Sequence, residues 1–292
     1  MKVFNITFII CILTGSLYAQ AQKVTEPSAT STPDWSRPYE PYRIVGNVYY
    51  VGTYDLACYL IVTPQGNILI NTGLAASAPI IENNIKTLGF KLSDTKILLT
   101  TQAHYDHLGA MAEIKKLTGA KMWVDEKDAP VMEDGGSSDY ELFGSTGSTY
   151  APIKADRLLK DGDIIKLGGT KLVMLHHPGH TKGSCSYLFD VKDENKIYKV
   201  LIVNMPTIIT NKKFEDVLEY PNISSDYANT FAAMKKLTFD LWLSSHANQF
   251  RMHSKHKTGD AYNPEAFRDK DGYDKAVSNF EAQYLRKLTN DK

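Results

Sequence analysis

The sequence carries no excess of either charge, since 33 lysines and arginines balance 33 aspartates and glutamates. No stretch gathers the basic residues that would follow a phosphate backbone, so nucleic acid is not expected as a partner. Long apolar runs are also missing, because the most apolar segment is shorter than the roughly 20 residues that cross a bilayer. The 292 residues, 43% of them hydrophobic, suffice for one large globular domain or two small ones packed together.

The one short apolar run lies at the N-terminus. Met1-Lys2-Val3 precedes the apolar residues 4–17, and Ala19-Gln20-Ala21 has the small-x-small pattern that a signal peptidase cuts. We interpret residues 1–21 as a secretory signal cleaved after Ala19 or Ala21. The prediction is therefore a periplasmic protein without membrane contact after cleavage. An uncleaved anchor and a lipid-modified Cys11 are the alternatives.

Cysteine is scarce. Beyond the signal only Cys58 and Cys185 remain, and in an exported protein such a pair is either bridged or free. Neither has a further cysteine or a histidine close by at ligand spacing. We interpret both as small buried hydrophobic residues and assign them no chemistry.

The chain after the signal divides into an arm and a domain. Residues 22–42 are rich in Thr, Ser and Pro and have no sustained apolar period, which predicts a draped arm. Residues 43–292 alternate strand-like runs with helical spacing. Strands are expected at 43–45, 48–51, 58–62, 67–71, 97–101, 122–124, 171–175, 185–190, 198–203 and 239–243. Helices are expected at 77–89, 111–119, 227–237 and 273–288.

The order of these segments predicts the architecture. Strands in two groups, each followed by helices, favour two sheets packed face to face with helices outside, a four-layer αββα sandwich in the α/β class.

Residues 133–152 are too rich in glycine for a regular element and long for a plain connection. That segment is either a wall of a site or a solvent-exposed loop.

Metal-type ligands fall in three clusters where predicted strands end. The clusters are Gln102-Ala103-His104-Tyr105-Asp106-His107, then His180, then His246. Histidine is scarce, with 8 in the chain, and half of these lie in the clusters. Loops at one end of a sandwich can bring such clusters together. A single histidine would more often be structural, but six candidates at three strand ends favour a metal centre.

The ligand types indicate zinc chemistry. Imidazole and carboxylate suit zinc, and three protein ligands leave a position for water. Zinc lowers the pKa of that water towards neutrality and so provides hydroxide at ordinary pH. We leave out His176 and His177, which flank the site, and His253 and His256, which are expected on a solvated polar stretch.

The chain resembles the metallo-beta-lactamase superfamily. Its motif His-x-His-x-Asp-His stands here as residues 102–107 with Gln102 first, its Gly-His-Thr-x-Gly-Ser element as residues 179–184, and its late histidine as His246. Within the superfamily the chain is similar to the third subclass (B3), and there to GOB-type enzymes, which carry glutamine in the first ligand position. The resemblance covers residues from about 41 to the end and implies a single domain.

The resemblance also implies two zinc sites. One would be formed by Gln102, His104 and His180, and the other by Asp106, His107 and His246. An amide oxygen is a weaker ligand than imidazole, so we expect one tightly bound zinc and a second, weaker one. Met205 occupies the place of a cysteine ligand in related subclasses, and we expect it to pack rather than coordinate, because a thioether is a poor zinc ligand. Asn71 stands where an aspartate often supports the ligand loop.

The implied function is hydrolysis of the beta-lactam ring of penicillins, cephalosporins and carbapenems by zinc-held hydroxide, which gives antibiotic resistance. Asp106, His107 and His246 would be the catalytic residues, and Thr207, Tyr140 and Phe143 would contact the substrate. A monomer is expected. The alternatives are another zinc hydrolase of this fold, such as a lactonase or thioester hydrolase, and a non-catalytic exported zinc-binding protein.

Overall fold

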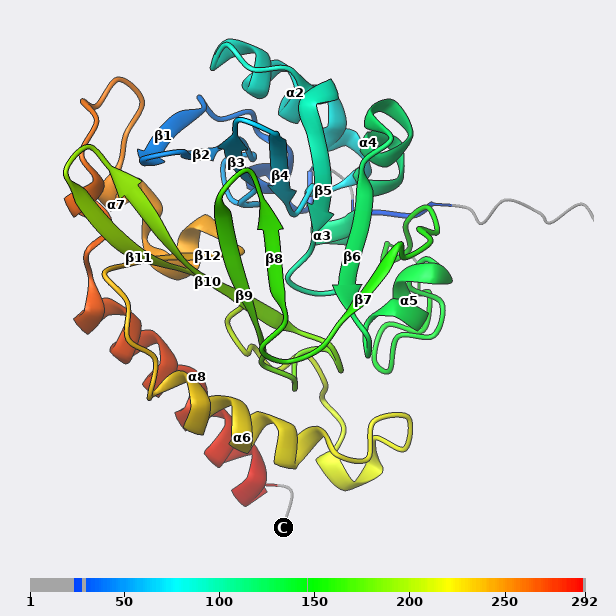
Figure 1. Ribbon diagram of the computed structural model, residues 1–292. Helices are drawn as coiled ribbons and strands as arrows, with labels where there is room; N and C mark the ends of the chain where they lie inside the picture. The colour runs from blue at the N-terminus through cyan, green and yellow to red at the C-terminus, as the bar shows by residue number, and fades with distance from the viewer. Residues whose placement is uncertain (1–23, 28–29, 146, 291–292) are drawn as a thin grey trace, which may run out of the picture.

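The computed structural model describes residues 24–27, 30–145 and 147–290 (Figure 1). The predicted signal, residues 1–21, and the start of the predicted arm lie outside the described residues. Within the described residues no helix is long and apolar enough to span a membrane.

Two sheets form the centre of the molecule. The first holds seven strands in the order β1 to β7, and the second holds five in the order β12-β11-β10-β9-β8. The first sheet comprises β1 (Tyr42–Val45), β2 (Val48–Tyr50), β3 (Tyr59–Thr63), β4 (Gly66–Ile70), β5 (Thr95–Leu99), β6 (Lys121–Asp125) and β7 (Arg157–Leu159). The second comprises β8 (Ile164–Leu167), β9 (Thr170–His176), β10 (Cys185–Asp193), β11 (Lys196–Val203) and β12 (Leu241–Ser244).

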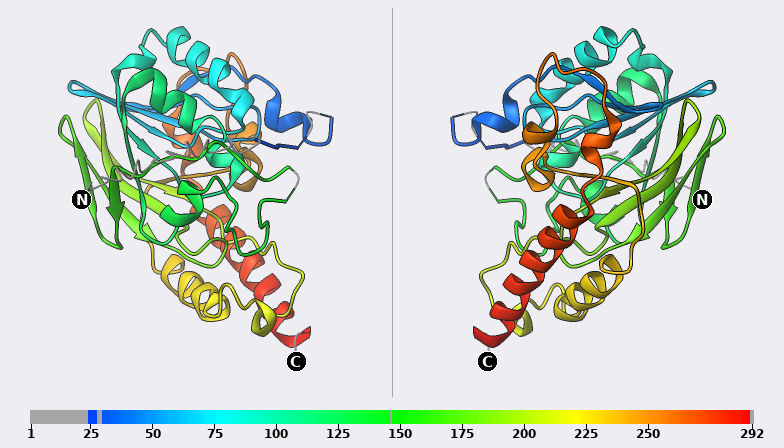
Figure 2. Two further views of the ribbon diagram at one scale, coloured as in Figure 1. Left: turned by 90° about the vertical axis from the view of Figure 1, so that its right-hand side faces the viewer. Right: turned by 90° about the vertical axis from the view of Figure 1, so that its left-hand side faces the viewer.

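Helices cover the outer faces of both sheets. In Figures 1 and 2, α2 (Ala78–Thr87) and α4 (Met111–Thr118) lie outside the first sheet, and α6 (Ile223–Met234) and α8 (Lys270–Asn290) lie outside the second. The short helices are α1 (Pro33–Ser36), α3 (Tyr105–Leu108), α5 (Ala129–Glu133) and α7 (Met252–Lys255). Two sheets between two helical layers confirm the predicted four-layer sandwich.

The first sheet is buried on both faces because successive side chains of its strands enter different cores. In β3, Tyr59 and Ile61 belong to the core between the sheets, whereas Leu60 belongs to the core under α2 and α4. Ile97 and Leu98 of β5 divide in the same way. Because side chains alternate across a strand, a run that is apolar throughout is needed wherever both faces are covered.

Parallel pairing aligns the strand ends that matter for function. Ile70 of β4 pairs with Leu99 of β5, and Val203 of β11 pairs with Ser244 of β12. The segments that follow these four strands therefore leave the two sheets at one end of the sandwich. An isolated bridge between Leu56 and His246 joins the two sheets there.

Cys58 and Cys185 are both free and buried. Burial raises the pKa of each thiol, so neither forms a thiolate readily. This agrees with the interpretation of both as small hydrophobic residues.

Candidate metal centre

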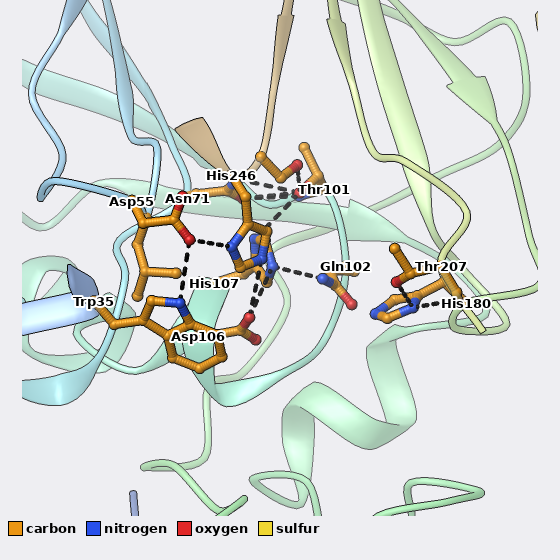
Figure 3. A network of polar contacts seen from close by, with 12 residues as sticks. Trp35, Asp55, Asn71, Thr101, Gln102, Asp106, His107, His180, Thr207 and His246 are labelled. Carbon is orange, nitrogen blue, oxygen red and sulfur yellow. Dashed lines mark hydrogen bonds and ion pairs between the residues drawn. The ribbon is translucent and has the colours of Figure 1, made fainter. Parts of the chain in front are cut away.

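Asp106, His107 and His246 converge beyond the strand ends. Asp106 and His107 lie in α3, directly after the loop that follows β5, and His246 follows β12. Asp106 Oδ2 lies 3.4 Å from His107 Nε2 and 3.3 Å from His246 Nε2. Their ligand atoms all lie within 4.8 Å of one another, and Figure 3 shows the three side chains pointing together. One carboxylate and two imidazoles form a set that suits zinc.

His104, His180 and Gln102 lie next to this group. The imidazole rings of His104 and His180 are 4.9 Å apart, edge to face. Gln102 Nε2 lies 2.5 Å from His107 Nε2, whereas Gln102 Oε1 is buried without a hydrogen-bond partner. A buried carbonyl oxygen without a partner is costly. A cation bound beside His104 and His180 would satisfy it, so the donor set fits a second metal.

In each candidate ligand histidine, the ring nitrogen that would not bind the metal contacts another group of the protein. His104 Nε2 lies 3.0 Å from Asp139 Oδ2, and His246 Nδ1 lies 3.3 Å from Asp55 Oδ2. His180 Nδ1 lies 2.9 Å from the carbonyl oxygen and from Oγ1 of Thr207. The contact of His107 Nδ1 with Thr101 Oγ1 is longer, at 3.5 Å. Such partners fix the ring and leave the remaining nitrogen for a metal, as in known metal sites.

Two buried carboxylates, Asp55 and Asp106, flank His246. The pKa shifts of Asp106 and His246 both indicate that positive charge is favoured between them. Although burial raises the pKa of Asp106, His107 and His246 hold it well below its ordinary value. Burial opposes a charge on His246, but hydrogen bonds to Asp106 and Asp55 raise the pKa of its imidazole to about 9. Positive charge between these carboxylates is therefore stabilised, and a divalent cation would supply it together with ligand bonds.

Asp139 has the same relation to His104. Burial raises the pKa of Asp139, but the charge and hydrogen bond of His104 outweigh burial and lower it to about 2. Its other oxygen, Oδ1, accepts hydrogen bonds from the backbone N–H groups of Glu141 and Leu142 at 2.9 and 2.7 Å. The glycine-rich loop therefore contributes a carboxylate that orients a candidate ligand.

Asp128 joins two of the ligand loops. Its Oδ2 accepts hydrogen bonds from Ala103 N at 2.9 Å and from Thr181 Oγ1 at 2.8 Å, and its Oδ1 accepts one from Gly183 N at 2.7 Å. A Cβ atom at Gly183 would lie 2.5 Å from Asp128 N, so only glycine permits this approach. Asp128 thereby holds the loop of His104 against the loop of His180.

Two tyrosines of the core between the sheets hold the loops of His104 and His246. Tyr187 of β10 donates a hydrogen bond to the Thr100 carbonyl at 2.7 Å, and Tyr59 of β3 donates one to the Ser244 carbonyl at 2.5 Å. Asn71 supports the ligand loop as well, since its Oδ1 accepts a hydrogen bond from Thr101 N at 3.0 Å.

Five of the six candidate ligands, all except His107, line a cavity of about 450 Å³. Thr207 and Met205 lie in its wall, as does Trp35 of α1. The arm therefore contributes a wall of the cavity. Met205 is 1% exposed and belongs to the core between the sheets.

The two aromatic residues predicted from the glycine-rich loop are not among the residues that line this cavity. Tyr140 is 2% exposed and donates a hydrogen bond to the His180 carbonyl at 3.1 Å, so it supports a ligand loop from beneath. Phe143 is 48% exposed and faces Lys212, and the residue that lines the cavity from this loop is Leu142.

The four histidines left out of the metal shell have other partners. His176 Nδ1 lies 2.7 Å from Asp125 Oδ2, and His177 Nδ1 lies 2.8 Å from Ser186 Oγ. The expectation of a solvated stretch was wrong for the other two. His253 and His256 are half-buried and stack on Tyr54 and Tyr42, with ring centroids 3.7 and 3.5 Å apart.

Sequence reasoning did not assign Asp55, Asp139, Asp128 or Trp35 to the site. Asp139 and Asp128 follow no ligand spacing, and Trp35 lies in a segment without apolar period. Asp55 also lies outside the three ligand clusters.

A four-layer sandwich whose strand-end loops assemble carboxylate and imidazole ligands defines a metal-dependent hydrolase fold. A family model described as "Metallo-beta-lactamase superfamily" matches residues 52–193. Two solved metallo-beta-lactamases at 65% and 56% identity show that the chain belongs to this superfamily.

Two solved structures resemble this chain over more than nine tenths of its length. The chain is 65% identical to the class B3 di-zinc metallo-beta-lactamase LRA-12 from an Alaskan soil metagenome, covering 91% of this chain and 100% of that one, with a TM-score of 0.88. It is 56% identical to the metallo-beta-lactamase GOB-18 from Elizabethkingia meningoseptica, covering 93% and 100%, with a TM-score of 0.90. The predicted similarity to B3 and GOB-type enzymes is confirmed.

Curated relatives match over shorter regions. Hydroxyacylglutathione hydrolase GloC of Haemophilus influenzae is 30% identical over 95 residues, which are 32% of this chain and 43% of that protein. The chain thus spans less than half the length of this relative.

Proposed function

We propose that the chain hydrolyses the ring amide of beta-lactam antibiotics with the help of zinc. The observation that carries this proposal is the convergence of Asp106, His107 and His246. Asp106 and His246 line a cavity of about 450 Å³, a volume suited to a small bicyclic substrate. The likeness to two metallo-beta-lactamases at 65% and 56% identity supports the substrate class.

Zinc held by Asp106, His107 and His246 would lower the pKa of water towards neutrality and so supply the nucleophile, and it would stabilise charge as the amide breaks. The chain's own contribution is orientation. Asp106 uses one oxygen, Oδ2, towards both imidazoles, and is placed to accept a hydrogen bond from the attacking water. Gln102, His104 and His180 would hold a second zinc.

The cavity wall indicates how the substrate carboxylate is bound. Among the described residues that line the cavity there is no lysine or arginine. Thr207, Asn204 and Asn248 are among the neutral hydrogen-bond donors in the wall, and Asn204 Nδ2 is buried without a partner. We infer that the carboxylate is bound by neutral donors, with Thr207 as one of them.

Gln102 allows a test of the zinc assignment. Replacing Gln102 by histidine should raise the zinc content towards two per chain, because imidazole binds zinc more strongly than a neutral amide does. Metal analysis of the purified variant beside the wild-type chain measures this. Equal stoichiometry in the two proteins would contradict the weak-site assignment.

The substrate class is tested by comparing turnover of a carbapenem, an acyl-homoserine lactone and a glutathione thioester by the zinc-loaded chain. We expect the carbapenem to be hydrolysed fastest. Faster turnover of the thioester would favour the activity named for the curated relative. Zinc binding without any turnover would favour a binding protein.

We further propose that the protein is exported to the periplasm by residues 1–21 and acts there as a monomer, so that it confers resistance where beta-lactams reach their targets. Support comes from the basic, apolar and small-residue order of this segment. Cell fractionation and the solution mass of the mature chain test the two statements separately.

A further inference from the structure

The N-terminal arm pairs with the turn that carries Asp55. The carbonyl oxygen of Asp34 accepts a hydrogen bond from Asp55 N at 3.1 Å, and that of Arg37 accepts one from Tyr54 N at 2.8 Å. Arg37 also lies over the Tyr54 ring, with its Cζ 3.2 Å from the ring centroid. These backbone and side-chain contacts hold α1 against residues 53–55. The Asp55 side chain in this turn is buried, with 6% of its surface exposed.

Trp35 reaches from this arm to the partner of a candidate ligand. Its indole Nε1 donates a hydrogen bond to Asp55 Oδ2 at 3.2 Å, and the same oxygen lies 3.3 Å from His246 Nδ1. Figure 3 shows the three side chains in series, with His246 continuing to Asp106. The Trp35 and His246 rings also contact each other, with centroids 5.6 Å apart.

Asn248 contacts both carboxylate oxygens of Asp55. Asp55 Oδ1 accepts a hydrogen bond from Asn248 N at 2.9 Å. With Oδ1 held by this backbone donor, the indole N–H and the Asn248 side-chain amide, which donates to Oδ2 at 3.3 Å, together restrict how Oδ2 can turn. Oδ2 in turn determines which way the His246 ring faces, because a metal-binding imidazole is oriented by the acceptor of its second nitrogen.

We propose that Trp35 is a positioning residue for the metal ligand His246, acting through Asp55, so that the N-terminal arm is part of the metal site. This inference rests on the proposed zinc site. The arm then affects how long the metal is retained, in addition to shaping the cavity. A tryptophan that served only as a cavity wall would affect substrate affinity and leave metal retention unchanged.

The test compares zinc retention in four proteins: the mature wild-type chain, Trp35→Phe, Asp55→Asn and the double variant. Phenylalanine keeps an aromatic ring in the wall and removes the N–H donor. Helix α1 has no buried residues, so this change should leave the fold intact, and thermal unfolding of the zinc-free proteins checks it. The control is Trp123→Phe, on the half-buried Trp123 of β6, which is absent from the cavity wall.

Zinc release into a colorimetric chelator is the measurement. We expect Trp35→Phe to release zinc roughly 10-fold faster and Asp55→Asn up to about 100-fold faster, the range known for residues that orient metal ligands. The double variant should release zinc no faster than Asp55→Asn, because Trp35 acts through that carboxylate. Trp123→Phe should match wild type.

Wild-type zinc retention in Trp35→Phe would overturn the inference, whether or not KM changes. So would a Trp35→Phe effect of full size in the Asp55→Asn background, since that would show a route that bypasses Asp55. If the wild-type chain itself retains no zinc, the proposed function fails instead, and the two failures are therefore distinguishable.

Discussion

Replacing Asp106 by asparagine is expected to lower kcat/KM for a carbapenem by on the order of 10³-fold. The amide is similar in shape but carries no charge, so it is a weaker ligand and a weaker acceptor for the attacking water. It also removes the carboxylate that stabilises positive charge between His107 and His246.

Steady-state kinetics with parallel zinc analysis measures this effect. Asp190→Asn is a matched control, because Asp190 of β10 is exposed and should tolerate the same chemical change. A variant at position 106 with turnover close to that of wild type would contradict the role of Asp106. Lost turnover at unchanged zinc content would assign the loss to water orientation rather than to metal binding.

Replacing Gly179 by alanine is expected to destabilise the folded chain by about 3–5 kcal/mol and to displace His180. The backbone at Gly179 has φ of +131°, a conformation that side chains rarely adopt, and a Cβ atom there would lie 2.7 to 2.9 Å from the Tyr227 ring. Tyr227 is fully buried and donates a hydrogen bond to the Thr207 carbonyl at 2.8 Å, so the ring cannot move aside cheaply.

Gly169→Ala separates the two causes. Gly169 also has positive φ, at +90°, but a Cβ atom there would meet nothing within 4 Å. This control should lose only about 1–2 kcal/mol, the cost of the backbone conformation. Thermal unfolding of both variants with and without zinc measures the difference. Equal losses would show that contact with Tyr227 does not matter.

The ligand residues could be predicted because their chemistry is visible along the chain. Asp106 and His107 are adjacent in sequence, and His246 lies two residues after β12, which begins with an apolar run. The long strands were equally visible, since a sheet buried on both faces requires continuous apolar runs such as β3 and β5.

The supporting residues could not be predicted in the same way. Asp139 contacts His104 although the two are 35 residues apart in the sequence. Trp35 contacts Asp55 from an arm that has no periodic pattern. Contacts of this kind depend on how loops pack, which local spacing does not encode. Strands β7 and β8 were missed because each buries a single side chain and exposes a large apolar one, Leu158 and Ile164, so their sequences do not show which face is buried.

The prediction for Tyr140 shows a related difficulty. An aromatic residue in a glycine-rich loop beside a site is equally compatible with contacting substrate and with packing below it. Only burial separates these roles, and Tyr140 is buried with its hydroxyl on the backbone of His180.

Zinc dependence of turnover tests the central claim most directly. The chain is stripped of zinc with a chelator, and carbapenem hydrolysis is then followed as zinc is added back, with circular dichroism recorded at each step. We predict that turnover disappears without zinc while the fold remains, because both apolar cores form without the metal ligands. We further predict that turnover returns as the tighter site fills. Hydrolysis that survives complete removal of zinc, or zinc binding that restores none, would contradict the account.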